Sequence, residues 1–247
     1  MMDKTYKLDW GIFALVEFMG SHSAEIGGRF TSALDIGSGD GIQSQILRDA
    51  GLKVFQLDKY SEKAEFKNDF LDQVFDQQFD VIYCSHVIEH QRNVGLFLDK
   101  IYDTLSDDGL LLLTAPKHPA DRIVEGHLNC FYITYLIQQL IHAGFDLKAG
   151  KVLSCGLVEN AVIASKARNF STPERHESGY QWNDYHKERS PIPLDGPGQI
   201  LNDLWLFHNC NVLSSPEPGA VKHSFRSDYK KIGITIDASR WGFTVNL

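Results

Sequence analysis

The feature that most constrains the fold is a glycine-rich turn between a short apolar run and a helix. Residues 33–36 favour a strand, residues 37–41 carry glycine at every second position, and residues 42–48 have helical spacing. Such a loop predicts a nucleotide-type site, because glycine lets the backbone lie against a ligand at the exposed N–H groups of the helix. A glycine-rich turn that binds nothing is the alternative.

The spacing of the glycines narrows the class of ligand. Dinucleotide-binding folds use G-x-G-x-x-G, whereas this loop reads G-x-G-x-G and is followed by Ile42. About twenty residues further on, residues 54–58 read as a second strand that ends in Asp58, the position from which such folds hold a ribose diol. These two motifs together resemble the class I S-adenosylmethionine-dependent methyltransferases, over roughly residues 25–167.

The resemblance implies S-adenosylmethionine as the cofactor and assigns its contacts. Asp35 and the glycine loop would shape the methionyl and ribose pocket, and Asp58 would hold the ribose. Asp69 would accept a hydrogen bond from the adenine amino group, with Phe70 beside the ring; a solvated turn carboxylate is the alternative for Asp69. The complete set of predicted cofactor-binding residues is Asp35, Gly37, Ser38, Gly39, Gly41, Asp58, Asp69, Phe70 and Ser85.

The rest of the pattern predicts an α/β fold with a doubly wound, seven-stranded, mostly parallel sheet. Strand and helix patterns alternate, and the apolar run 110–116 has the composition of a central parallel strand. The other predicted strands are 66–71, 79–84, 152–155 and 158–166, and the predicted helices are 10–19, 93–105 and 134–143. The last two strands would form the reversed pair of the class I methyltransferase sheet.

Beyond this domain, the chain changes character. We expect residues 1–167 to form the cofactor-binding domain and residues 168–247 to form an irregular C-terminal extension packed on it. Within the extension, we expect a helix over 200–208 and strands over 232–236 and 243–245. The extension has no motif, and a lid, an oligomer contact or simple packing on the sheet are all open to it.

Three histidines are candidates for catalysis or metal binding. His86 and His90 are four residues apart, but the sequence H-V-I-E-H differs from H-E-x-x-H, so no metal site is expected. His86 follows closely on the predicted strand 79–84 and should border the pocket, which makes it a candidate for a catalytic or substrate-binding role. His127 lies in a polar loop before an aromatic pair, as in small-molecule methyltransferases, and is the predicted base for an acceptor hydroxyl; ordering the loop is its alternative role.

Composition limits the partners. The net charge is −8, and lysine and arginine form no run, which disfavours nucleic acid as a substrate. The four cysteines lack C-x-x-C spacing, which favours buried thiols in a reducing compartment over disulfides or zinc. No window has the length and purity of a membrane span, so we expect a cytoplasmic protein without a membrane partner; a homo-oligomer stays open.

The sequence therefore predicts a methyltransferase that acts on a small molecule, at a hydroxyl group. A sugar or sugar nucleotide of surface-polysaccharide synthesis, or a phenol or quinone precursor, would be the acceptor. One alternative is an NAD(P)-dependent Rossmann oxidoreductase or epimerase, against which the missing third glycine and the lack of a Y-x-x-x-K pair argue. A catalytically silent cofactor-binding module is the other.

Overall fold

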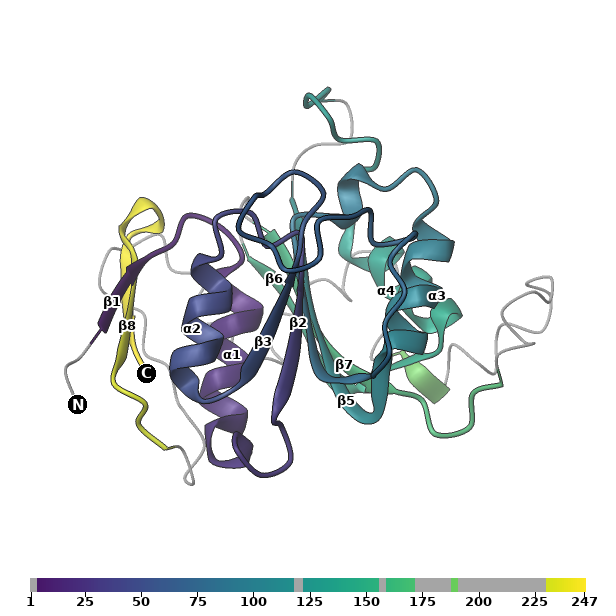
Figure 1. Cartoon of the computed structure of the whole chain (residues 1–247). Helices are drawn as coiled ribbons and strands as arrows, with labels where there is room; N and C mark the ends of the chain where they lie inside the picture. Colours follow the sequence, from purple (N-terminus) through teal and green to yellow (C-terminus); the bar gives the residue numbers. More distant parts are fainter. Residues whose placement is uncertain (1–3, 118–121, 156–158, 172–187, 191–229) are drawn as a thin grey trace.

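The centre of the protein is a six-stranded, mostly parallel sheet (Figure 1). The computed structural model describes residues 4–117, 122–155, 159–171, 188–190 and 230–247. The strands are β2 (Ser32–Ile36), β3 (Lys53–Leu57), β4 (Phe79–Ser85), β5 (Leu105–Pro116), β6 (Phe145–Cys155) and β7 (Glu159–Lys166). Their order is β3-β2-β4-β5-β7-β6, and only β7 runs in the direction opposite to the other five strands. The predicted doubly wound sheet with a reversed strand pair is therefore confirmed.

Helices cover both faces of this sheet. α1 (Ile12–His22) and α2 (Ile42–Ala50) lie on one face, and α3 (Val94–Thr104) and α4 (Ile133–Ala143) lie on the other (Figure 1). In α3, the apolar stripe Val94, Phe97, Leu98 and Ile101 is buried against the sheet, as helical periodicity requires. The four predicted helices are thus present, and no helix in the described ranges has the length and hydrophobicity needed to cross a membrane.

The sheet has one strand fewer than the seven expected, among the described residues. Of the predicted strand 66–71, only Phe66 forms a bridge, an isolated parallel one to Leu57 at the outer edge of β3. The side chain of Asn68 accepts from the N–H of Asp69, and Asp69 Oδ1 accepts from the N–H of Leu71. These local hydrogen bonds occupy the backbone N–H groups of Asp69 and Leu71, which a strand would donate to a neighbouring strand.

The two ends of the chain form a second, three-stranded sheet. β1 (Lys4–Lys7) pairs in parallel with β8 (Ile234–Ala238), which pairs antiparallel with β9 (Phe243–Asn246). Ile236 and Leu247 are fully buried in the same core as α1 and α2. The late strands are confirmed, whereas the helix expected over 200–208 lies outside the described residues. Residues 230–247 pack on the N-terminal part, and the division into two domains stays a prediction.

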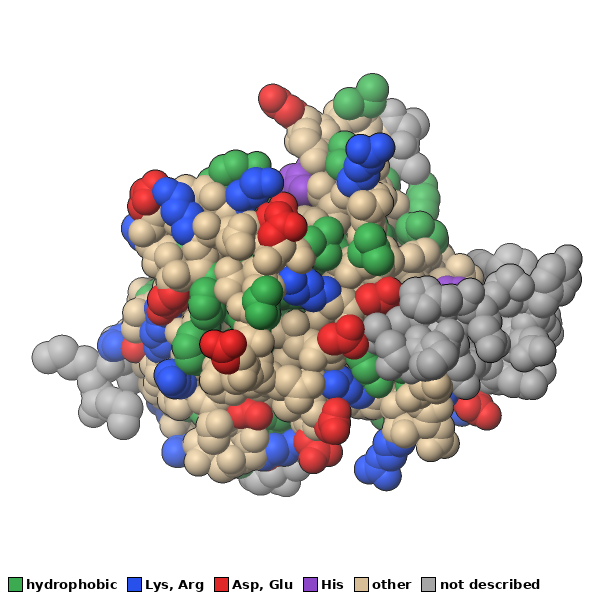
Figure 2. All heavy atoms as spheres, turned by 45° about the vertical axis from the view of Figure 1, so that its right-hand side comes forward, with side chains coloured by type: hydrophobic (Ala, Val, Ile, Leu, Met, Phe, Trp, Pro, Cys, Tyr) green, Lys and Arg blue, Asp and Glu red, His purple; other side chains and the backbone are tan. Residues whose placement is uncertain are grey.

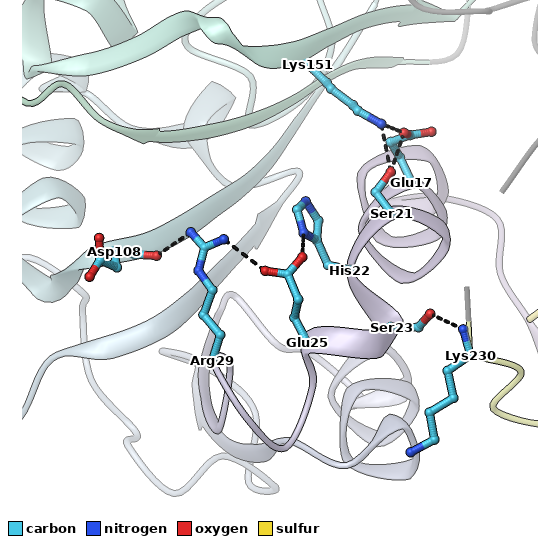
Figure 3. Close-up of polar contacts among 9 residues, drawn as sticks. All are labelled: Glu17, Ser21, His22, Ser23, Glu25, Arg29, Asp108, Lys151 and Lys230. Carbon is cyan, nitrogen blue, oxygen red and sulfur yellow. Dashed lines mark hydrogen bonds and ion pairs between the residues drawn. The ribbon is translucent and has the colours of Figure 1, made fainter. Parts of the chain in front are cut away.

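Polar contacts fix the C-terminal end of α1 to its surroundings (Figure 3). Glu17 forms an ion pair with Lys151 of β6. Arg29, in the loop after α1, donates to a backbone carbonyl of β5 at 3.0 Å. Ser23 Oγ accepts from the backbone N–H of Lys230 at 2.9 Å, so the segment that leads into β8 is held to the same helix end. α1 is therefore anchored to both sheets.

Candidate functional site

The carboxyl ends of β2, β3, β4 and β5 meet at one edge of the sheet, drawn uppermost in Figure 1. The loops after these strands leave from this edge, and residues 122–132 project above it. In open α/β sheets ligands bind outside the carboxyl ends of the strands, so this edge is the candidate site. The predicted site residues lie in or beside these loops.

The glycine loop is held on one side by β3 and open on the other. The N–H groups of Gly37 and Ser38 donate to the carbonyl of Leu57, at 2.8 and 3.2 Å. Gly37 has φ 74°, and a Cβ there would lie 2.2 Å from the side chain of Val87, so glycine is required. A Cβ at Gly39 would meet no atom within 4 Å. The loop backbone at Gly39 is therefore accessible to a ligand.

Asp58 joins the end of β3 to this loop. One carboxylate oxygen accepts from the N–H of Gly39 at 2.9 Å, and the other accepts from the N–H groups of Tyr60 and Ser61, each at 2.8 Å. Burial disfavours the charged form, but the three backbone donors outweigh it and hold the pKa of Asp58 below its usual value. The structure thus places an ionised carboxylate beside the glycine loop, where the sequence predicts the ribose contact.

Asp35 lies beneath the loop, at the end of β2. Its carboxyl is buried and accepts a hydrogen bond from Ser44 Oγ of α2 at 2.5 Å. Burial raises the pKa of Asp35 to about 7, against the lowering effect of the Ser44 bond. Ser38 Oγ is also buried and has no hydrogen-bond partner within the described ranges. A buried hydroxyl without a partner in an accessible glycine loop fits a site that a polar ligand completes.

The predicted adenine contacts lie after β3, and core packing already occupies one of them. Asp69 forms an ion pair with Lys59, at 3.2 Å. Phe70 is 4% exposed and packs edge-on against Phe97 of α3, with ring centroids 5.2 Å apart. Asp69 is therefore half-buried and paired with Lys59, whereas Phe70 contributes chiefly to the core. Their adenine-binding roles stay predictions.

A buried carboxylate organises the end of β4. Glu159, the first residue of β7, is fully buried, and its two oxygens accept from the N–H groups of Gly11 and Phe13, at 2.9 and 3.2 Å. It therefore caps the N-terminus of α1, where an anion is favoured by the helix dipole. The oxygen that bonds to Gly11 also lies 2.9 Å from His86 Nε2.

His86 is held in an unusual backbone conformation beside this carboxylate. It is the one non-glycine residue with positive φ, 55°, among the described residues. Burial disfavours the imidazolium, but Glu159 outweighs this effect and raises the pKa of His86. The ring of Trp10 lies 5.3 Å from the imidazole ring, and the neighbouring Ser85 Oγ accepts from Thr114 at 2.8 Å.

Sequence reasoning missed Glu159 and Glu89. Glu159 and Asn160 are polar residues inside the predicted strand 158–166, whose other residues up to 164 are apolar, and this interruption is the available signal. Glu89 lies in H-V-I-E-H and is fully buried between the candidate histidines. Its Oε1 lies 3.6 Å from His86 Nδ1 and 3.7 Å from His90 Nε2, and His127 lies against His90. The two predicted catalytic histidines, His86 and His127, thus both lie near the Glu89 carboxylate. His86 faces it directly, whereas His127 packs against His90.

Comparison with known proteins agrees with this geometry. Residues 12–149 match the model of a methyltransferase domain family, which is more than half of the chain. The chain belongs to the class I S-adenosylmethionine-dependent methyltransferases. The cofactor of this methyltransferase is S-adenosylmethionine. The family therefore argues against the alternative of an NAD(P)-dependent oxidoreductase or epimerase. No curated protein sequence matches the chain significantly.

Several solved structures are similar to this methyltransferase. The 1,6-didemethyltoxoflavin-N1-methyltransferase of Burkholderia thailandensis is 18% identical with a TM-score of 0.49, covering 61% of this chain and 79% of that one. An S-adenosylmethionine-dependent methyltransferase of Archaeoglobus fulgidus is 18% identical with a TM-score of 0.46, covering 56% and 86%. Human N-acetylserotonin methyltransferase is 19% identical with a TM-score of 0.47, covering 64% and 51%.

Proposed function

We propose that this methyltransferase transfers a methyl group from S-adenosylmethionine to a hydroxyl group of a small-molecule acceptor. The observation that carries the proposal is the contact between Asp58 and the N–H of Gly39, which brings the two cofactor motifs together at the carboxyl edge of the sheet. Bound S-adenosylmethionine supplies a methyl group on a positively charged sulfur. The protein then has to align the acceptor and accept one proton.

The cofactor would lie along the glycine loop. Asp58 has a lowered pKa and stays ionised at neutral pH. Three backbone N–H groups already donate to its carboxylate, so it would hold the ribose by accepting a hydrogen bond from one ribose hydroxyl. Ser38 and the backbone at Gly39 would meet the methionyl and ribose portions, and Ser85 would border the same pocket. Asp69 would accept from the adenine amino group. These assignments follow the family motif, residue by residue.

His127 is the proposed proton acceptor for the hydroxyl, and His86 the proposed positioning residue. Both ring nitrogens of His86 face carboxylates, Glu159 at 2.9 Å and Glu89 at 3.6 Å, which leaves it poorly placed to take a proton from an acceptor. His127 lies in the loop that projects from the carboxyl edge and is half-buried. Its imidazole can therefore reach an acceptor that enters from solvent.

The acceptor class is proposed from the polarity of this edge and of the surface. A sugar or sugar nucleotide fits the polar, histidine-rich sequence of loop 117–131 better than a phenol or quinone precursor, which is the second choice. On the face seen in Figure 2, lysine and arginine side chains are interspersed with aspartate and glutamate, which agrees with the net charge of −8. This mixture supports a small-molecule acceptor over nucleic acid.

Calorimetric titration with S-adenosylhomocysteine, with NAD in a parallel cell, tests the cofactor assignment. We expect binding of the former alone. Asp58→Ala should weaken it by about tenfold or more, since a hydrogen bond to a charged group contributes roughly 1.5–3 kcal/mol. The matched control is Asp146→Ala, because Asp146 likewise accepts from two N–H groups that follow it, but at the opposite edge. Binding of NAD, or equal losses in the two variants, would contradict the proposal.

Release of S-adenosylhomocysteine in the presence of candidate acceptors tests the transfer. We expect turnover with a sugar nucleotide, and a loss of turnover in His127→Ala with S-adenosylhomocysteine binding unchanged. Turnover with phenols alone would move the acceptor to the second class. Full activity of His127→Ala would refute the proton-acceptor assignment, and binding without turnover on any acceptor would favour a catalytically silent module.

A further inference from the structure

Glu89, His90 and His127 form a cluster of which the proposed transfer uses only His127. One ligand atom from each lies within 4.8 Å of the other two. Glu89 and His90 belong to a short 3₁₀ helix, η2 (Ile88–His90), directly after β4, and His127 comes from the loop after β5. Two imidazoles and one carboxylate are the donor set of many divalent transition-metal sites.

The tautomer of His90 fits a metal ligand. His90 Nδ1 lies 2.8 Å from the carbonyl oxygen of Gly126, and because a carbonyl only accepts, this nitrogen carries the proton. In the neutral ring, the other nitrogen, Nε2, presents a lone pair, and it lies 3.7 Å from Glu89 Oε1. Metal-binding histidines characteristically donate their second N–H to a backbone carbonyl or a carboxylate, which fixes the ring.

The backbone holds the two parts of the cluster together without a ligand. The carbonyl of Glu89 accepts from the N–H groups of Leu128 and Asn129, at 2.8 and 3.0 Å. Asn129 Nδ2 also donates to the carbonyl of Gln91, at 2.7 Å. The loop that carries His127 is therefore fastened to η2 at Glu89 and, just beyond η2, at Gln91. The imidazole rings of His90 and His127 stand at 84° with centroids 5.0 Å apart.

The separations are close to what a metal ion requires. In a tetrahedral site with ligands at about 2.1 Å from the ion, the ligand atoms lie about 3.4 Å apart, and Glu89 Oε1 and His90 Nε2 are 3.7 Å apart. The remaining separations, up to 4.8 Å, need a closure of at most about 1.4 Å, which rotation of the His90 and His127 rings provides. Three protein ligands leave at least one coordination position for water or another oxygen donor.

We propose that Glu89, His90 and His127 bind one divalent transition-metal ion. The sequence prediction considered His86 with His90 and expected no metal. The structure instead turns His86 toward Glu159 and brings His90 to His127. Imidazole nitrogens favour Zn²⁺, Mn²⁺ or Co²⁺ over Mg²⁺, which prefers oxygen ligands. With an ion bound, the His127 nitrogen that faces the cluster is a ligand, and only its other ring nitrogen could accept the proton of the proposed transfer. Loss of activity in His127→Ala therefore does not distinguish the two roles.

Metal binding is therefore measured directly, on the whole 247-residue chain stripped with a chelator and without cofactor. Separate calorimetric titrations use Zn²⁺, Mn²⁺ and Mg²⁺, and the visible absorption of added Co²⁺ reports the ligand set. We expect one equivalent of Zn²⁺ or Mn²⁺, binding at least about tenfold weaker in His90→Ala and in His127→Ala. His142→Ala, on α4, is the matched control and should bind as the parent does.

The outcomes separate this proposal from the proposed function. Binding that both cluster variants lose and the control keeps supports the site, whatever the transfer assay gives. Absence of binding by all three ions, or binding that survives in both cluster variants, overturns it and leaves the cofactor assignment intact. His90 is exposed, so His90→Ala should stay folded; circular dichroism checks this, and the parallel His127 variant gives a second reading of the same site.

Discussion

The buried carboxyl of Asp35 is expected to make this methyltransferase less stable as the pH rises from 5 to 8. Burial raises the pKa of Asp35 to about 7 from the reference value of 3.8. Over the interval between these two values, the folded protein keeps a proton that the unfolded chain has already released. The unfolded state then binds fewer protons than the folded state, so the free energy of unfolding falls with increasing pH.

The size of the effect follows from the two pKa values. Each unit of difference corresponds to about 1.4 kcal/mol, so ionisation of Asp35 lowers the free energy of unfolding by about 1.5 kcal/mol at pH 5 and about 4 kcal/mol at pH 8. Asp35→Asn keeps the shape and an oxygen acceptor for Ser44, but it has no charge to bury. The stability of Asp35→Asn relative to the parent should therefore rise by about 2.5 kcal/mol between pH 5 and pH 8.

Urea unfolding at pH 5, 6.5 and 8, followed by tryptophan fluorescence, measures this difference. Asp80→Asn is the matched control, because burial opposes ionisation of Asp80 but hydrogen bonds from Thr31 and Ser32 outweigh it and lower its pKa. Asp80 is therefore ionised in both states over this range, and its variant should differ from the parent by a constant amount. The same constancy in Asp35→Asn would refute the reasoning, since it would mean that Asp35 ionises near its ordinary pKa.

Three further predictions concern the elements around the site. Glu159→Gln should lower the free energy of unfolding by about 2–3 kcal/mol in urea, because an amide cannot accept both N–H groups of α1; a change below about 0.5 kcal/mol would contradict the cap. Gly11→Ala should lower the melting temperature by at least about 4 °C, because φ is 69° and a Cβ would lie 2.2 Å from Tyr83 Oη; an unchanged melting temperature would show that the turn relaxes. Ile236→Ala should cost about 2–4 kcal/mol and Ile236→Val about 1 kcal/mol, because Ile236 is fully buried; equal stability of both variants and the parent would mean that β8 does not dock.

Local patterns were sufficient to predict the central sheet. Residues 111–113 of β5 are fully buried, which matches the uninterrupted apolar run of a strand covered on both faces. The turn at residues 37–41 indicated the first strand-to-helix junction because its three glycines all have positive φ, a backbone conformation that glycine adopts without strain. These features depend on residues near each other in the sequence, which is why a single sequence reveals them.

Features that depend on distant partners were not predictable. β1 has no alternation of buried and exposed residues and becomes a strand by pairing with β8, some 230 residues further along the chain. Glu159 acquires its role from Gly11, which is 148 residues away. The predicted strand 66–71 failed for the opposite reason, since local bonds of Asn68 and Asp69 were stronger than the tendency to extend the sheet.

The histidines show how tertiary context decides chemistry that spacing leaves open. A spacing of four residues places two imidazoles on one face only if the chain between them is helical. Here His86 has φ 55° and the 3₁₀ helix begins at Ile88, so the backbone changes direction between His86 and His90. His86 consequently meets the carboxylate that caps α1, while His90 meets a histidine that the sequence places 37 positions later, in another loop. The turn after β4 therefore determines which groups each imidazole contacts, and so whether it can serve as a metal ligand or as a base.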